Sequence, residues 1–161
     1  MELGLQDLAE NVITTFKLKG LTLAVAESAT GGFLSHYLTN VDGSSRVFLG
    51  SVVAYTAFSK NNLLDVDIDT ITNYGAISRE TTEALLQGLK AKIGADITIA
   101  ITGIAGSTIV EGKPRGLMYI GFSSGTQIKI EEFNFFGTRY EIKAQTVKAV
   151  FEILLRELAA F

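Results

Sequence analysis

The order of apolar and polar positions along the chain predicts alternating helices and strands. Residues 5–19 carry apolar side chains at helical spacing on one face, and Gly20 follows as a typical helix-ending residue. Short apolar runs at 21–26, 51–55 and 96–102 have the length and composition of buried strands. Because these strands alternate with helical segments, the pattern favours an α/β fold.

The alternation continues in the rest of the chain, where 117–122 and 127–136 are typical of a hairpin across the turn 123–126. Residues 65–74 are ambiguous. Further helices are expected at about 31–40 and 58–64, from Ser78 to about residue 93, and after a capping box at 138–141. We therefore predict a three-layer α/β/α sandwich with a mixed, mostly parallel sheet, in a single domain over residues 1–161.

Composition narrows the class of protein. A hydrophobic fraction of 47% with 19% charged residues fits a soluble globular domain, and no apolar run approaches the roughly 18 residues that span a bilayer. Residues 1–4 lack the basic region and cleavage site of a signal peptide. The absence of cysteine from the sequence excludes disulfides and thiol nucleophiles and suits a reducing compartment. We expect a cytoplasmic protein with no membrane partner.

Charge and ligand patterns argue against several kinds of site. A net charge of −3 gives no electrostatic reason to bind nucleic acid. One histidine without cysteine argues against zinc, and the P-loop pattern is absent. Asp65, Asp67 and Asp69 resemble the opening of a calcium loop. Thr70 and Ala76, however, stand where that loop needs glycine and glutamate. We expect no metal site and no nucleic-acid partner.

The chemistry is expected in the segment that follows the strand at 21–26. A polar turn with Ser28 and Thr30 comes first, and then Gly31 and Gly32 at the start of a helix. The N–H groups of a first helical turn favour negative charge, and glycine lets a substrate approach the backbone closely. The alternative is that Ser28 or Thr30 only caps the helix.

Two other predicted strands end in polar residues. Tyr55 ends the strand at 51–55, and Thr102 with Gly103 ends the strand at 96–102. In open α/β sheets, ligands bind outside the carboxyl ends of the strands. If the strands are parallel, these positions and Ser28 converge at one edge of the sheet, which favours a binding site over a simple cap.

The choice of catalytic base is narrow. The only histidine, His36, lies inside the predicted helix and more than a turn from Ser28, which argues against a Ser-His-Asp triad. Lys60 is the best-placed alternative base. Its pKa would have to fall from about 10.4 to about 7–8, through burial or nearby cations. The alternative for Lys60 is an ordinary solvent-exposed charge on a helix.

Six motifs in order resemble one known family. They lie at 26–32 (Ala-Glu-Ser-Ala-Thr-Gly-Gly), at 43–45 with Phe48, at Tyr55 with Lys60 and 63–64, at 75–78, at 102–106 and at 113–116. Together they resemble the CinA C-terminal domain family, the nicotinamide-nucleotide amidases, over nearly the whole chain.

This resemblance implies hydrolysis of nicotinamide mononucleotide to nicotinate mononucleotide and ammonia, without metal or cofactor. It suggests Ser28 as the nucleophile, with Lys60 and Tyr55 as its activating partners. It also implies a homo-oligomer. The resemblance further assigns the oxyanion or the substrate to Thr102 and Gly103 and to the backbone of Thr30, Gly31 and Gly32, and the substrate phosphate to Arg139.

The sequence departs from the family at a few positions. Residues 107–112 contain a β-branched run, 108–110, where the family has proline and a glycine-rich loop. Thr138 and Lys143 replace an acidic residue and an arginine. The larger members also carry an N-terminal domain resembling molybdopterin-binding proteins, whose pyrophosphatase activity we do not transfer. Two alternatives stay open: a nucleotide-binding or regulatory module without turnover, and an enzyme acting on another small amide or phosphorylated ribosyl compound.

Overall fold

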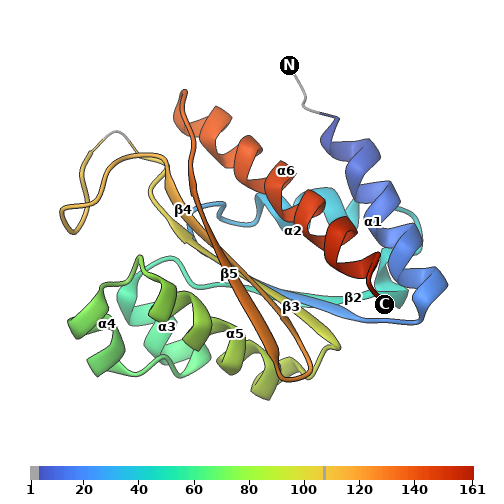
Figure 1. The fold of residues 1–161 in the computed structure, drawn as a ribbon, viewed down its shortest axis with the longest axis horizontal. Helices are drawn as coiled ribbons and strands as arrows, with labels where there is room; N and C mark the ends of the chain where they lie inside the picture. The colour runs from blue at the N-terminus through green and yellow to red at the C-terminus, as the bar shows by residue number, and fades with distance from the viewer. Residues whose placement is uncertain (1–3, 107) are drawn as a thin grey trace.

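Five strands form one mixed sheet at the centre of the computed structural model, which describes residues 4–106 and 108–161 (Figure 1). The predictions about residues 1–3 and about Ser107 lie outside this part of the chain. The strands are β1 (Leu23–Glu27), β2 (Phe48–Val53), β3 (Ile97–Gly103), β4 (Leu117–Ser124) and β5 (Gln127–Asn134), in the order β2-β1-β3-β4-β5. β1 pairs in parallel with β2 and β3, whereas β4 pairs antiparallel with β3 and β5. Parallel pairing therefore makes up half of this mixed sheet and not most of it.

Helices cover both faces of the sheet, as the α/β sandwich prediction requires (Figure 1). One layer holds α1 (Leu5–Lys19), α2 (Phe33–Thr39) and α6 (Arg139–Leu158), and the other holds α3 (Ala57–Leu64), α4 (Ile68–Tyr74) and α5 (Arg79–Ile93). A short 3₁₀ turn, η1 (Ser44–Arg46), precedes β2. Segment 65–74, which the sequence left ambiguous, contains α4 after an N-cap at Asp67.

The two faces of the sheet bury side chains of different size. Leu23 and Val25 of β1 pack in the core beneath α1, α2 and α6, while Ala24 and Ala26 of the same strand face the α5 side. Small side chains on that side let a helix lie close to the sheet, and a Cβ at Gly121 of β4 would lie 2.8 Å from a methyl group of Leu86. β1 is thus buried on both faces, as its unbroken apolar run predicted.

Three predicted boundaries near the site were wrong. β1 extends to Glu27, and β2 ends at Val53, so Tyr55 lies beyond the strand instead of ending it. β2 is an edge strand and is only partly buried. α2 begins at Phe33 because Gly31 and Gly32 have φ angles of 57° and 97°, in the left-handed region, which cannot continue a right-handed helix.

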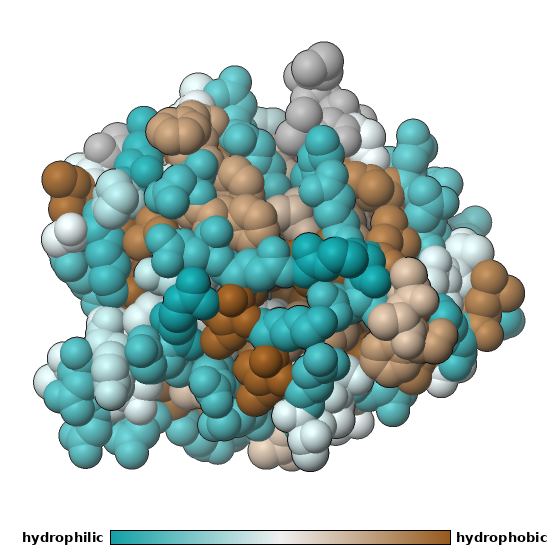
Figure 2. Space-filling model, in the orientation of Figure 1, coloured by the Kyte–Doolittle hydropathy of each residue, from teal (hydrophilic) through white to brown (hydrophobic). Residues whose placement is uncertain are grey.

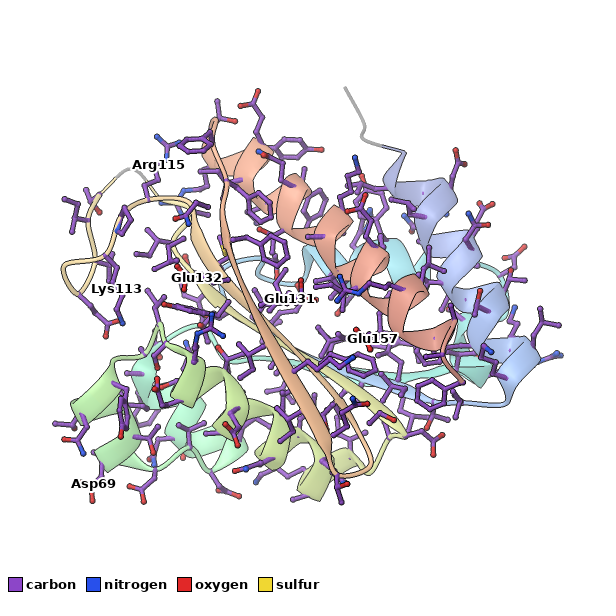
Figure 3. The ribbon with its side chains drawn as sticks, viewed as in Figure 1. Asp69, Lys113, Arg115, Glu131, Glu132 and Glu157 are labelled. Carbon is purple, nitrogen blue, oxygen red and sulfur yellow. The ribbon has the colours of Figure 1, made fainter. Side chains whose placement is uncertain are left out.

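The β5 side of the molecule is polar. Figure 2 shows a largely hydrophilic surface with scattered apolar groups on this face. Glu131 and Glu157 lie near each other between β5 and α6 (Figure 3), where Arg156 contacts both and Lys129 lies 2.7 Å from Glu157. In the described part of the chain, every helix is too short or too polar to cross a bilayer.

Candidate active site

A cavity of about 290 Å³ opens where β1, β2 and β3 end. These three strands are parallel, so their carboxyl ends meet at one edge of the sheet, as the sequence predicted. The cavity is lined by Ser28 and Ala29 after β1, Tyr55 after β2, Gly103–Gly106 at the end of β3, Thr108 and Val110 from the next loop, Ile77 before α5, and Arg139 at the start of α6.

Ser28 and Lys60 form a buried pair at this cavity. The Lys60 Nζ atom lies 3.0 Å from Ser28 Oγ and 3.0 Å from the carbonyl oxygen of Ala54. Only 2% of Lys60 is exposed. Its helix, α3, starts with a capping box in which Thr56 and Ser59 bond to each other's backbone N–H groups, and this start directs Lys60 back toward β1.

Burial changes the acid–base chemistry of Lys60. Removal from water disfavours the charged ammonium and lowers the pKa of Lys60 from 10.5 to about 8, while the negative charge of Glu111 acts in the opposite direction. A substantial fraction of this amine is therefore neutral at mildly alkaline pH. A neutral amine within hydrogen-bond distance of a serine hydroxyl can accept its proton. The alternative interpretation of Lys60 as an exposed helix charge is wrong.

Glu27 holds the turn that carries Ser28. Its buried carboxylate accepts hydrogen bonds from Thr30 Oγ1 at 2.6 Å and from the N–H groups of Gly32, Leu34 and Ser35. The Ser35 hydroxyl donates a further bond. A carboxylate with five donors is well compensated for its burial. It also occupies the start of α2, so the expectation that these amides are free for a ligand was wrong.

We expect replacement of Glu27 by glutamine to lower the free energy of unfolding by about 3 kcal/mol. Both carboxylate oxygens of Glu27 accept hydrogen bonds, and glutamine replaces one of them with an NH2 group that cannot accept. Urea unfolding at pH 7.5 measures this difference. Glu83→Gln, a change at an exposed carboxylate on α5, is the matched control and should stay within about 0.5 kcal/mol of the unsubstituted protein. Equal losses in the two variants would contradict a structural role for Glu27.

The other residues predicted after β1 lie beside the cavity wall. Thr30 is fully buried and its hydroxyl donates a hydrogen bond to Glu27. The N–H group of Gly31 donates to the Ser28 carbonyl oxygen, and that of Gly32 donates to Glu27. These groups shape the turn around Ser28, and the lining of the cavity does not include them. Their role as direct substrate donors therefore has no support in the geometry.

Of the residues predicted after β2 and at the end of β3, Tyr55 and Gly103 line the cavity and Thr102 does not. Tyr55 lines the cavity at its rim with 58% of the residue exposed, but its hydroxyl makes no hydrogen bond to Ser28 or Lys60 in the described chain. Gly103 lines the cavity. The hydroxyl of Thr102 instead lies buried 2.9 Å from that of Thr82 on α5, where it ties the strand to the helix.

Arg139 brings a positive charge to the opposite wall. It is the first residue of α6, after the Thr138 cap, and it lines the cavity. The capping box between Thr138 and Glu141 shows that threonine serves as the helix cap here. A Cβ at Gly106 would lie 2.8 Å from Arg139 Nη2, so glycine leaves room for the guanidinium. Across residues 4–106 and 108–161, that guanidinium makes no hydrogen bond or ion pair.

Comparison with known proteins identifies the family. The family model of the CinA C-terminal domain matches residues 5–158. The chain belongs to the CinA C-terminal domain family. The resemblance inferred from the six motifs is thereby confirmed.

Relatives and solved structures of the CinA family agree with this assignment. The chain is 45% identical over 134 residues to a putative competence-damage inducible protein of Desulforamulus reducens, covering 83% of this chain and 33% of that protein. The Bacillus subtilis protein of the same name is 39% identical over 142 residues, 88% of this chain and 34% of that one. The chain therefore spans about a third of the length of these curated relatives.

Solved CinA structures have the same fold. A CinA superfamily protein from Klebsiella pneumoniae has a TM-score of 0.95 at 29% identity, with 98% of this chain and 99% of that one covered. The competence/damage inducible protein CihA from Agrobacterium tumefaciens has a TM-score of 0.90 at 34% identity, with 94% of each chain covered.

Sequence reasoning missed three contributors to the site. Glu27 was quoted as part of a motif without a role, although an acidic residue between a buried strand and a helix start is a recognisable signal. Glu111 acts on Lys60 from a distant loop, and no local pattern indicated it. Ile77, which follows the Gly-Ala pair of the fourth motif, forms part of the cavity wall.

Proposed function

We propose that this CinA-family chain hydrolyses the carboxamide of nicotinamide mononucleotide to give nicotinate mononucleotide and ammonia. The observation that carries the proposal is the buried contact of 3.0 Å between Lys60 Nζ and Ser28 Oγ at the edge of the cavity. A hydroxyl beside an amine whose pKa is lowered to about 8 is suited to nucleophilic attack on an amide.

In the proposed first half-reaction, neutral Lys60 accepts the hydroxyl proton as Ser28 Oγ forms a bond to the carboxamide carbon. Ala29 and Ala105 line the cavity, and their N–H groups make no hydrogen bond within the described part of the chain. We assign them to the oxyanion of the tetrahedral intermediate. The Lys60 ammonium then gives its proton to the departing nitrogen, and ammonia leaves an ester on Ser28.

Water completes the cycle. Lys60, neutral again, takes a proton from a water molecule that attacks the ester carbonyl carbon. The second tetrahedral intermediate expels Ser28 Oγ, which recovers its proton from Lys60. The product is a carboxylic acid, formed where the amide was, which loses its proton to solvent and becomes a carboxylate. The free enzyme is left with Lys60 neutral.

The cavity walls suit a flat ring with an anionic substituent. Tyr55, Ile77 and Val110 offer apolar surface on which a pyridine ring can pack. Arg139 lies in the same cavity at the N-terminus of α6, where both the guanidinium and the helix dipole favour a phosphate group.

Arg139→Met is expected to raise KM for nicotinamide mononucleotide by about 10- to 100-fold, because a charged hydrogen bond to phosphate is lost. Ammonia release measured with this nucleotide and with nicotinamide riboside, which has no phosphate, separates charge recognition from general damage. The variant and the unsubstituted protein should have similar KM values for the riboside. A KM that rises equally for both compounds would contradict phosphate recognition by Arg139.

The same assay decides between the proposed activity and its alternatives. Ammonia and nicotinate mononucleotide formed in equal amounts would support the proposal. Nucleotide binding without ammonia would support a binding or regulatory module. If the nucleotide neither binds nor reacts, another small amide or phosphorylated ribosyl compound becomes the substrate to test.

A further inference from the structure

Two charged side chains fasten the loop that follows β3 to the segment between α4 and α5. The Glu111 carboxylate accepts hydrogen bonds from the N–H groups of Ala76 at 2.8 Å and Ile77 at 3.1 Å. Lys113 on the same loop donates to the carbonyl oxygens of Tyr74 and Ile77. Figure 3 shows Lys113 on the side of this loop that faces α3 and α4. We call this set of contacts the Glu111–Lys113 clasp.

The tip of the loop is a tight turn. Val110 and Lys113 exchange two backbone hydrogen bonds, with N–O distances of 3.3 and 2.8 Å. The two residues between them, Glu111 and Gly112, both have positive φ angles, 55° and 70°. A turn of this kind favours asparagine or glycine at its first central position, and glutamate there is strained. The hydrogen bonds of the Glu111 carboxylate offset that strain.

The clasp joins two segments that both line the cavity. Val110, next to Glu111, and Ile77, whose N–H and carbonyl groups are both held, lie on the wall of the cavity that contains Ser28. Lys113 Nζ lies 3.9 Å from the Glu111 carboxylate, so the two charges also face each other. The hydrogen bonds of the clasp join the tip of the loop to the segment that contains Ile77, and so hold Val110 toward Ile77.

We propose that Glu111 and Lys113 are positioning residues that fix this wall of the cavity and thereby determine how tightly the substrate ring is held. The proposal rests on the proposed function for the identity of the substrate. It accounts for a loop with β-branched residues where the family has a glycine-rich one, because the tip of the loop is bonded to the segment before α5.

Amide hydrogen exchange tests the clasp without any substrate. In Glu111→Ala, the amides of Ala76 and Ile77 should exchange about 10- to 100-fold faster, since each loses a charged acceptor. Lys113→Met should weaken the same protection, and Glu111→Gln, which keeps one acceptor oxygen, should give a smaller effect. Glu83→Gln on α5 is the matched control, with exchange at both amides unchanged.

Two further measurements test whether the clasp acts on the site. Glu111→Ala should raise KM for nicotinamide mononucleotide about tenfold or more, with a smaller change in kcat. Glu111→Gln removes a negative charge and should move the titration of the Lys60 side chain, followed by NMR of labelled lysine, to lower pH by about 0.3 or more. The groups facing Lys60 are the Ser28 hydroxyl and the Ala54 carbonyl, with Tyr55 and Arg139 in the same cavity, and these variants leave them intact.

The measurements test separately whether the clasp exists, whether it positions the site, and whether the proposed function holds. Unchanged exchange at Ala76 and Ile77 in Glu111→Ala would overturn the clasp. Faster exchange with KM and the Lys60 titration both unmoved would reduce it to a structural contact and overturn its positioning role. If the unsubstituted protein releases no ammonia from the nucleotide, the proposed function fails, while exchange and the Lys60 titration still decide the clasp. Glu111→Gln keeps these tests possible if the alanine variant does not fold.

Discussion

Ser28→Ala is expected to abolish ammonia release from nicotinamide mononucleotide, with kcat lowered by about 10⁴- to 10⁶-fold. The hydroxyl is the only group of residue 28 that can form the ester intermediate. In the alanine variant Lys60 can still accept a proton, but no hydroxyl remains at residue 28 to donate one. The measurement is steady-state ammonia release together with calorimetric binding of the nucleotide. Binding should change less than about threefold, because Ser28 contributes little to ground-state contacts in the proposed mechanism.

The same substitution at a serine away from the cavity controls for a general effect of serine-to-alanine replacement on the fold. Ser124→Ala changes the last residue of β4, which pairs with Ile97 at the start of β3 and therefore lies at the end of that strand opposite the cavity. It should leave kcat unchanged. Full turnover in Ser28→Ala would remove the nucleophile assignment, whatever the behaviour of Lys60. A loss of nucleotide binding equal to the loss of turnover would also contradict it, because the serine would then act in binding.

The pairing of Ser28 with Lys60 could be predicted because topology reduces the choices. Three parallel strands place their carboxyl ends together, and the segment after β2 contains Lys60 one helical turn beyond Thr56. The sequence has no cysteine and one histidine, and that histidine lies on the exposed side of α2. What the sequence could not supply was the burial of Lys60, which depends on the packing of α3 against the sheet.

The role of the Thr30 and Thr102 hydroxyls was harder to predict for a physical reason. A hydroxyl at the end of a strand can face a ligand or satisfy a buried neighbour, and composition does not distinguish the two. Thr30 bonds to Glu27, and Thr102 bonds to Thr82, a residue twenty positions away on α5. Such partners come from the packing between helix and sheet, which local periodicity does not encode.

The Glu111–Lys113 clasp illustrates the same limit over a longer distance. Glu111 accepts hydrogen bonds from Ala76 and Ile77, which lie 35 and 34 residues before it in the sequence. The sequence did mark the loop as unusual, because β-branched residues replace a glycine-rich segment. It did not show that Glu111 would adopt a left-handed backbone conformation, or that its carboxylate would accept hydrogen bonds from N–H groups in the segment before α5.

The stability of the protein should depend on pH through Lys60. Its pKa is about 8 in the folded protein and 10.5 in an exposed lysine, so the unfolded chain binds one more proton between these values. Because the unfolded state binds more protons, stability rises with pH in this window. Below pH 8, burial of the ammonium costs about 3 kcal/mol, and that cost disappears as pH rises toward 10.5.

Lys60→Met removes this titration and most of the burial cost. The unfolding free energy of the unsubstituted protein, minus that of Lys60→Met, should therefore rise by about 2–3 kcal/mol between pH 7 and pH 10. Urea unfolding at three pH values measures the difference, and the pH dependence shared by both proteins cancels. Lys148→Met, at a lysine on α6 paired with Glu152 on the surface, is the control whose difference should stay constant within about 0.5 kcal/mol.

The same substitution links stability to the proposed reaction. With Lys60 as the base, kcat/KM of the unsubstituted protein should increase with pH up to about 8 and then level off, because only the neutral amine accepts the Ser28 proton. Lys60→Met should lose this dependence along with most of its activity. Two results together would contradict this role of Lys60: a difference in unfolding free energy that does not change with pH, and a pH–rate profile that is the same in Lys60→Met. Both effects depend on the same proton of Lys60, so Lys60 would then be neither a buried amine of lowered pKa nor the base.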